Sequence, residues 1–230
     1  MIMASPSRRF RNRQDAGRQL AAALHYLHGA HPVILALPRG GVPVAFEVAQ
    51  ALQAELDLLF VRKLGAPGHE ELGIGAVVDG DDPQIVLNEE VVRQLAPSPA
   101  YIEAEKLRQL AEIDRRRAEY MQGHPPVSLA GRTVILVDDG IATGGTVRAA
   151  LAGLRKTKLE RLVLAVPVAP MEAIMQLTPY CDGIVCLSQP DQFYAVGAHY
   201  DNFDQTSDEE VINLLKAAAP FGEKHFIPQH

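Results

Sequence analysis

The amino-acid sequence predicts an α/β fold: a doubly wound, mostly parallel sheet with helices on both faces. Short apolar runs alternate along the chain with segments of helical spacing, which is the order typical of parallel sheets. Several of these runs are apolar at almost every position, as expected for strands that are buried on both faces. With 230 residues the chain can build one sizeable core, so we expect a single domain over residues 1–230.

The first predicted elements are a helix, a strand, a second helix and a second strand. Arg13 to Leu27 places its apolar residues on one stripe, which predicts a helix. Val33 to Leu37 is short and apolar, and it stops at a turn-like Pro-Arg-Gly-Gly sequence. Val42 to Leu52 returns to helical spacing, and Leu56 to Val61 is a second apolar strand.

The middle of the chain is less regular. Gly65 to Gly75 carries glycine, proline, histidine and paired acids, which predicts a mobile loop. Ala76 to Val78 and Ile85 to Leu87 predict a strand pair around a turn at Asp79 to Pro83. A long helical insertion at about 98–122 begins with serine as N-cap and proline at the first helical position.

The remaining elements return to the alternating order. Gly131 to Val137 is the third central strand, and Thr146 to Lys156 is its crossover helix. Leu162 to Ala169 and Ile184 to Leu187 are two further strands, and Asp208 to Ala219 is a terminal helix.

Charge and cysteine content exclude several classes of function. The net charge of −6 argues against broad nucleic-acid binding. Arg115 to Arg117 lie among acidic residues of the long helix, so a solvated face with ion pairs is favoured over a phosphate or RNA grip. Cys181 and Cys186 lack metal-ligand spacing, which favours core packing and fits a cytoplasmic protein. No apolar stretch approaches the ~20 residues of a membrane span, and no secretory signal is expected at the N-terminus.

The most informative segment is the run from Thr133 to Thr146. A buried strand stops at Asp138 and Asp139, and a small glycine-bearing loop leads into a helix. Backbone N–H groups at such a helix start, together with the hydroxyls of Thr143 and Thr146, can bind a phosphate. The two carboxylates can accept hydrogen bonds from a vicinal diol, so the segment predicts a site for a sugar phosphate such as ribose 5-phosphate. The alternative is a strand end with a helix cap and a glycine turn.

Three chemically suggestive segments directly follow predicted strands. They are Pro38 to Gly41, Arg62 to Gly65 and Asp138 to Thr146. Because ligands of an open parallel sheet bind beyond the carboxyl ends of its strands, we expect these segments to share one rim. The first two supply candidate cations, although each could also be an ordinary turn or strand end.

The strand, the two aspartates, three residues and Thr143-Gly144-Gly145-Thr146 resemble the 5-phosphoribosyl-1-pyrophosphate (PRPP) signature of type I phosphoribosyltransferases. Further stretches are similar to the branch usually labelled predicted phosphoribosyltransferases. These stretches are residues 10–17, 62–68, 137–146, 165–169 and 193–208. The resemblance implies Mg²⁺-dependent transfer from PRPP in a cytoplasmic homodimer.

The resemblance also implies roles for individual residues. Asp138 and Asp139 would hold the ribose, and Arg39, Lys63 and the two aspartates would be catalytic. The 5′-phosphate would be bound by Ala142, Thr143, Gly144, Gly145 and Thr146. The pyrophosphate would be bound by Arg39, Gly40, Gly41, Arg62 and Lys63. Mg²⁺ would be held through substrate oxygens and water rather than by direct protein ligands.

Lid and hood elements are expected at about 65–88 and 190–205, outside the core sheet. His69 in the lid is a candidate acid or base, or a solvated surface residue. Aromatic side chains of the hood could stack on a flat base or close a hydrophobic core. These side chains are Phe193, Tyr194, Tyr200 and Phe203.

The acceptor is left open by the sequence. Ala142 stands where 6-oxopurine enzymes carry an acid, which argues against a loop aspartate as base but not against a nucleobase acceptor. The favoured function is therefore transfer to a nitrogenous acceptor, such as a nucleobase, with release of pyrophosphate. The alternatives are a regulator that senses PRPP or a nucleotide without turnover, transfer to a non-base amine, and nucleotide phosphorolysis.

Overall fold

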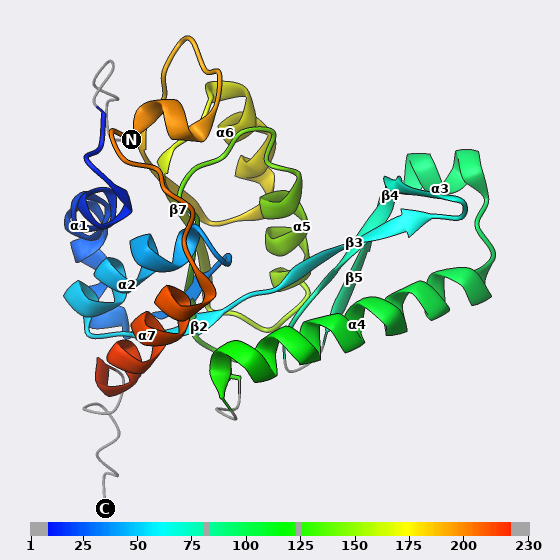
Figure 1. The fold of residues 1–230 in the computed structure, drawn as a ribbon, viewed down its shortest axis with the longest axis horizontal. Coiled ribbons are helices and arrows are strands. Elements are labelled where there is room, and N and C mark those ends of the chain that lie inside the picture. The colour runs from blue at the N-terminus through cyan, green and yellow to red at the C-terminus, as the bar shows by residue number, and fades with distance from the viewer. Residues whose placement is uncertain (1–8, 81–82, 123–125, 222–230) are drawn as a thin grey trace, which may run out of the picture.

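The computed structural model describes residues 9–80, 83–122 and 126–221, without the side chains of residues 70 and 71. Its centre is a sheet of five parallel strands in the order β2-β1-β6-β7-β8 (Figure 1). The strands are β1 Val33–Ala36, β2 Glu55–Leu58, β6 Thr133–Val137, β7 Arg161–Val168 and β8 Gly183–Ser188. The predicted α/β class with a parallel sheet is therefore confirmed.

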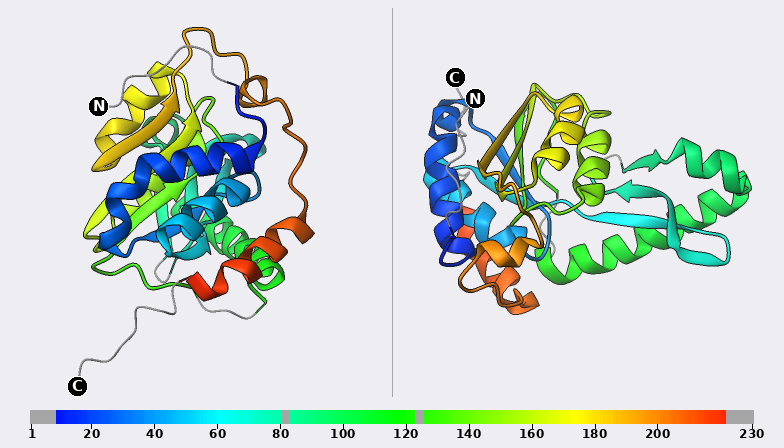
Figure 2. Two further views of the ribbon diagram at one scale, coloured as in Figure 1. Left: turned by 90° about the vertical axis from the view of Figure 1, so that its left-hand side faces the viewer. Right: turned by 90° about the horizontal axis from the view of Figure 1, so that it is seen from above.

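Helices cover both faces of this sheet (Figures 1 and 2). On one face lie α1 Arg13–Leu24 and α2 Gly41–Leu52, with α7 Asp208–Ala218 beside α2. On the other face lie α5 Gly145–Leu154 and α6 Met171–Leu177. Short 3₁₀ helices connect some of these elements. They are η1 His25–Ala30, η2 Thr178–Tyr180, η3 Val196–His199 and η4 Ala219–Phe221.

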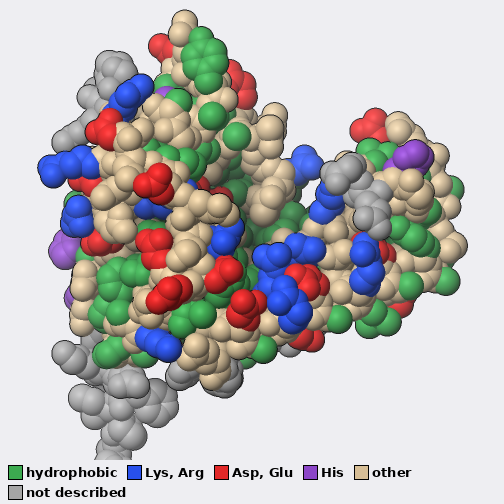
Figure 3. Space-filling view, viewed as in Figure 1, with side chains coloured by type: hydrophobic (Ala, Val, Ile, Leu, Met, Phe, Trp, Pro, Cys, Tyr) green, Lys and Arg blue, Asp and Glu red, His purple; other side chains and the backbone are tan. Residues whose placement is uncertain are grey.

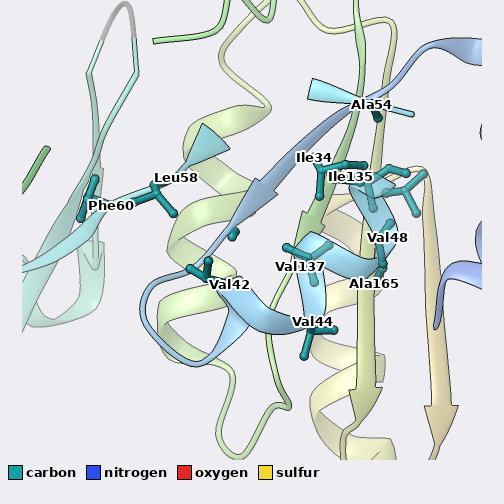
Figure 4. Packing of buried hydrophobic residues seen from close by; sticks show 14 of the residues in the cluster. Ile34, Val42, Val44, Val48, Ala54, Leu58, Phe60, Ile135, Val137 and Ala165 are labelled. Atoms are coloured by element: carbon teal, nitrogen blue, oxygen red, sulfur yellow. The ribbon is translucent and has the colours of Figure 1, made fainter. Parts of the chain in front are cut away.

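The core divides at the sheet because successive strand residues point to opposite faces. Ile34, Ile135 and Val137 pack with α2 on one face, as Figure 4 shows. Their chain neighbours Val134 and Leu136 pack against α5 and α6 on the other. Cys181 and Cys186 are buried, free thiols in or beside this second layer, as predicted.

A second, three-stranded antiparallel sheet projects from the core together with two helices, and we call residues 61–121 the arm (Figures 1 and 2). It comprises β3 Val61–Ala66, β4 His69–Val78, β5 Gln84–Leu87, α3 Glu89–Leu95 and α4 Pro99–Met121. None of the described helices, including the 23-residue α4, is both long and apolar enough to cross a bilayer.

The prediction of a loop from Gly65 to Gly75 is wrong, because β3 and β4 form a hairpin through most of this segment. Contacts with α4 explain why a glycine-rich segment is ordered there. Tyr101 donates its hydroxyl to the carbonyl of Gly65 at 3.0 Å, and the Gly65 N–H donates to the buried Glu105. Leu64 and Ile74 belong to the main hydrophobic core. The predicted strand 56–61 is also wrong at its end, since β2 stops at Leu58 and β3 begins at Val61.

The predicted strand pair around residues 79–83 is present as β4 and β5, although residues 81–82 of its turn lie outside the described residues. At the root of the arm, the side chain of Arg117 is only 13% exposed, whereas the sequence predicted a solvated face there. Its guanidinium donates to Asp57 at 3.2 Å and to Asp79 at 2.7 Å. It also donates to the carbonyl of Leu58 at 3.0 Å, so one side chain of α4 joins β2 to the residue that follows β4. Arg115 and Arg116 do pair with Glu112 on the surface.

The strand order reverses direction at β1. The chain adds β2 on one side of β1 and β6 on the other, so the crevice beyond the carboxyl ends of β1 and β6 is the switch point of the sheet. Ala36 lies opposite Val137 in the register of these two strands. The segments that follow them, Pro38 to Gly41 and Asp138 to Thr146, therefore start side by side.

Candidate active site

The turn after β1 packs directly against the two aspartates after β6. A Cβ atom at Gly41 would lie 2.9 Å from the carbonyl oxygen of Val137, and one at Gly40 would lie 2.1 Å from Oδ2 of Asp139. Only glycine fits at either position without displacing its neighbour. The peptide bond between Pro38 and Arg39 is cis. The structure therefore brings together the two segments for which the sequence predicted pyrophosphate and ribose contacts.

The loop from Ala142 to Thr146 is open to solvent. Ala142, Thr143, Gly145 and Thr146 are exposed, and Gly144 turns the chain with a φ of 75°. Arg148 is the first residue whose N–H bonds back along α5, to the carbonyl of Gly144. The N–H groups just before it are those that a helix leaves without internal partners, and these suit an anion.

Asp139 is held by groups from two other parts of the chain. Nε of Arg13, the first residue of α1, donates to Oδ2 of Asp139 at 2.7 Å, and both side chains are largely buried. The hydroxyl of Tyr200 donates to the carbonyl of Asp139 at 2.6 Å. The N–H of Asp139 donates to Oδ1 of Asp138 at 2.9 Å. One aspartate therefore has a cation partner, and its neighbour has only a backbone N–H.

The environment affects the protonation of both carboxyl groups. Loss of water raises the pKa of Asp138 well above 3.8, and the adjacent carboxylate of Asp139 raises it further. Burial also raises the pKa of Asp139, while the hydrogen bond and charge of Arg13 oppose that rise. Two carboxylates with raised pKa values at the edge of a sheet are typical of a functional site.

Asp138→Asn is expected to stabilise the fold at neutral pH. A carboxyl whose pKa is raised on folding destabilises the native state above that raised pKa, and the effect disappears as the pH falls toward 3.8. Asparagine keeps the acceptor for the Asp139 N–H. We expect a gain of about 1 kcal/mol at pH 8 and a smaller gain at pH 5. Thermal unfolding at both pH values measures this. The control is Glu103→Gln, which changes a carboxylate in an exposed ion pair with Lys106. A variant less stable than wild type at pH 8 would contradict this reading of Asp138.

Arg39, the predicted pyrophosphate cation, lies at the same rim. Its Nη1 is 3.4 Å from Oδ1 of Asp208 at the start of α7. The hydroxyl of Tyr120, near the end of α4, donates to the same oxygen. These contacts hold the pKa of Asp208 below its usual value, first through Tyr120 and then through the charge of Arg39. Arg39 is thus linked through one carboxylate to the helix of the arm.

Arg62 and Lys63 do not lie at the end of a parallel strand, as the sequence predicted, but within β3 of the arm. Nε of Arg62 donates to Oε1 of Gln109 on α4 at 3.0 Å. Arg62 also lines an open cavity of ≈ 400 Å³ with residues of α4. Lys63 lies against Gly73 of β4 and is exposed. His69 is exposed at the start of β4. Figure 3 shows basic and acidic side chains mixed where the arm joins the core.

The predicted base-stacking aromatics divide into buried and exposed rings. Tyr200 is 5% exposed and packs between Phe10 and Phe203, so it offers no open face to a flat base. Phe193 stacks on His199 with ring centroids 5.3 Å apart. Tyr194 is 86% exposed and keeps its ring available. Of the two alternatives that the sequence left open, Tyr200 therefore closes a hydrophobic core.

Sequence reasoning missed Arg13, although the sequence held a signal. The buried face of α1 contains Ala16, Leu20 and Leu24, and Arg13 continues that face toward the N-terminus. An arginine on a buried stripe, at the helix end where the dipole disfavours cations, needs a buried anion as partner.

The chain matches a known family of domains and resembles several known proteins. A model of the "Phosphoribosyl transferase domain" matches residues 10–202. A Mycobacterium tuberculosis protein named "Putative phosphoribosyl transferase" is 48% identical over 209 residues, which are 91% of this chain and 47% of that protein. The chain thus spans about half the length of this relative.

Two further proteins match this chain, one over most of its length and one over half of it. The crystal structure of TT1426 from Thermus thermophilus is 44% identical in sequence, covers 90% of this chain and 97% of its own, and superposes with a TM-score of 0.78. A ribose-phosphate pyrophosphokinase of Methanopyrus kandleri is 35% identical over 133 residues, which cover 50% of this chain and 45% of that protein.

Proposed function

Because the chain belongs to the phosphoribosyl transferase domain family, we propose that it transfers the phosphoribosyl group of PRPP to a nitrogenous acceptor, a nucleobase, and releases pyrophosphate in an Mg²⁺-dependent reaction. One observation carries this proposal. The paired aspartates and the open turn from Ala142 to Thr146 lie at the switch point of the sheet, where a diol and a phosphate could be bound together.

The ribose phosphate would be bound through the chain after β6. Asp138 and Asp139 accept hydrogen bonds from the ribose hydroxyls in this proposal, and the 5′-phosphate enters the turn at the start of α5. The open state of the turn supports this, since a phosphate needs backbone N–H groups that are not covered by side chains. Fixing both ends of the sugar would orient its anomeric carbon for attack.

The pyrophosphate would lie over the turn after β1. Gly40 is half-buried and has no side chain that would cover its backbone, and Arg39 stands beside it with a guanidinium. To bind the pyrophosphate, Arg39 would leave its 3.4 Å contact with Asp208. We propose Lys63 as a second cation, supplied from the arm, and Arg62, which donates to Gln109, as a lesser contact.

Mg²⁺ fits this site as a substrate-bound ion. The described residues hold no group of three or more His, Cys, Asp or Glu side chains arranged for a metal, and the acidic pair has one member engaged by Arg13. Mg²⁺ commonly binds substrate phosphates and keeps several of its water ligands, so the proposal needs no carboxylate as a direct ligand. When bound, the ion would neutralise charge that develops on the leaving pyrophosphate.

We propose that the hairpin of β3 and β4 serves as the lid and that residues 190–205 serve as the hood. A lid would exclude water from a reaction centre that resembles an oxocarbenium ion. Tyr194 is the remaining exposed aromatic of the hood and is our candidate for contact with the base. We also propose a cytoplasmic homodimer, to be tested by sedimentation, without nucleic-acid or membrane partners.

Turnover tests the proposed function directly. The protein is incubated with PRPP, MgCl₂ and a panel of purine and pyrimidine bases, amines and nucleotides, and pyrophosphate release is measured. Release with one acceptor, lost in the Asp138→Asn/Asp139→Asn variant, is the expected result. Binding of PRPP without release for any acceptor would favour the sensor. Release that is unchanged in the double variant would exclude this site.

A further inference from the structure

Arg13 makes three contacts, one with the acidic pair and two with the segment before α7. Its Nε donates to Oδ2 of Asp139 at 2.7 Å, and its Nη1 donates to the carbonyl of Asp204 at 2.6 Å. Its guanidinium carbon lies 3.9 Å from the centroid of the Phe203 ring. The side chain is 10% exposed. These contacts fix the guanidinium in one plane, as planar hydrogen bonding and stacking allow for arginine but not for lysine.

Residues 199–204, which contact the Arg13 guanidinium, are themselves paired with the residues just before α1. Phe10 bridges to Tyr200, and the N–H groups of Asp201 and Asn202 donate to the carbonyls of Phe10 and Arg11. The start of α1 and residues 199–204 therefore form one unit over the end of β6. Asp139 is attached to this unit at its carboxylate by Arg13 and at its carbonyl by Tyr200.

We infer that Arg13 is a positioning residue, which fixes the Asp139 carboxylate with Oδ2 turned to the guanidinium and Oδ1 left to a ribose hydroxyl. Within the described parts of the chain, Oδ1 of Asp139 has no hydrogen-bond partner. Gly40 closes the Oδ2 side, since a Cβ there would lie 2.1 Å from that oxygen. The inference rests on the proposed function, because the hydroxyl belongs to PRPP.

The electrostatic consequence follows from the same contact. The hydrogen bond and the positive charge of Arg13 lower the pKa of Asp139 against the effect of burial. Without the guanidinium, Asp139 would retain its proton to a higher pH, and a protonated carboxyl accepts hydrogen bonds poorly. PRPP affinity is expected to fall as the pH is lowered and Asp139 takes up a proton. Replacing Arg13 should therefore make this fall begin at a higher pH.

Arg13→Met, Arg13→Lys and a matched control, Arg18→Met, test this inference. Arg18 lies on the same helix and has an exposed guanidinium 3.3 Å from Glu47. Two quantities are measured for each folded variant: PRPP affinity by calorimetry with MgCl₂ across pH, and the titration of the Asp139 carboxyl carbon by ¹³C NMR without ligand. If Arg13 had a purely structural role, its replacement would lower the melting temperature. At temperatures where the variant is folded, PRPP affinity and the Asp139 titration would both be unchanged.

For Arg13→Met we expect PRPP affinity at neutral pH to fall at least about tenfold, as when one member of a buried charge pair is truncated. The Asp139 titration should move to higher pH, and Arg13→Lys should lie between Arg13→Met and wild type. Arg18→Met should match wild type in both measurements. If Arg13→Met does not fold, wild-type affinity in Arg13→Lys overturns the inference.

The outcomes separate the two proposals. If wild type binds PRPP and folded Arg13→Met binds it equally well, the inference is overturned and the proposed function stands. An unchanged Asp139 titration in Arg13→Met also overturns the inference. If wild type binds no PRPP at all, the proposed function falls and the inference falls with it.

Discussion

Gly40→Ala is expected to reduce PRPP affinity by about two orders of magnitude while the fold is retained. The new Cβ would stand 2.1 Å from Oδ2 of Asp139, so the carboxylate must move by roughly 1 Å and its bond to Arg13 must break. The backbone at Gly40 has helical φ and ψ angles, which alanine accepts. The effect is therefore steric and local to the aspartates. Calorimetry with PRPP and MgCl₂ measures it.

A second glycine provides the control for this prediction. Gly183 begins β8, and a Cβ there would meet nothing within 4 Å. Gly183→Ala should bind PRPP as wild type does. Equal affinity in Gly40→Ala and Gly183→Ala would show that the turn after β1 does not set the position of Asp139 in the ligand-bound protein.

Arg117→Met is expected to lower the free energy of unfolding by about 3–5 kcal/mol, because it leaves buried carboxylates without a cation. The side chain of Asp57 is 3% exposed and that of Asp79 is 7% exposed, and both accept hydrogen bonds from Arg117. Burial already raises the pKa of Asp57 despite this partner. Urea unfolding at pH 7 measures the loss, which should shrink at lower pH as the Asp57 carboxyl takes up a proton.

The adjacent Arg115 gives the matched control. It pairs with Glu112 and Glu119 on the exposed side of α4, so Arg115→Met should leave the unfolding midpoint nearly unchanged. Adding Asp57→Asn and Asp79→Asn to Arg117→Met should recover part of the stability, since no unpaired charge remains. Equal midpoints for the two arginine variants would mean that this buried network does not stabilise the root of the arm.

The parallel sheet could be predicted because strands buried on both faces are apolar at nearly every position. Thr133 to Val137 is buried at every position, and so is most of β7. The acidic pair and the glycine turn after β6 were also readable, because their residue types and order fit a diol and a phosphate at a helix start. These features depend on residues that are adjacent in sequence, and on the rule that ligands bind beyond the carboxyl ends of parallel strands.

The arm and the partners of the acidic pair could not be read in the same way. The segment from Gly65 to Gly75 has the composition of a loop, and its hairpin is supported by Tyr101 and Glu105 from a helix much later in the chain. The bond between Arg13 and Asp139 joins residues 126 positions apart. The sequence left both base stacking and core packing open for Tyr200, and its burial against Phe10 again depends on tertiary contact. Such pairings arise only when the chain has folded.

The central claim is that Asp138, Asp139 and the turn from Ala142 to Thr146 form one site for PRPP. Calorimetric titration of wild type and of Asp138→Asn/Asp139→Asn with PRPP and MgCl₂ tests it most directly, since both carboxamides keep the size of the side chains they replace. The account predicts saturable binding by wild type and loss of most of the affinity in the folded variant. Equal affinity in the two proteins would contradict it.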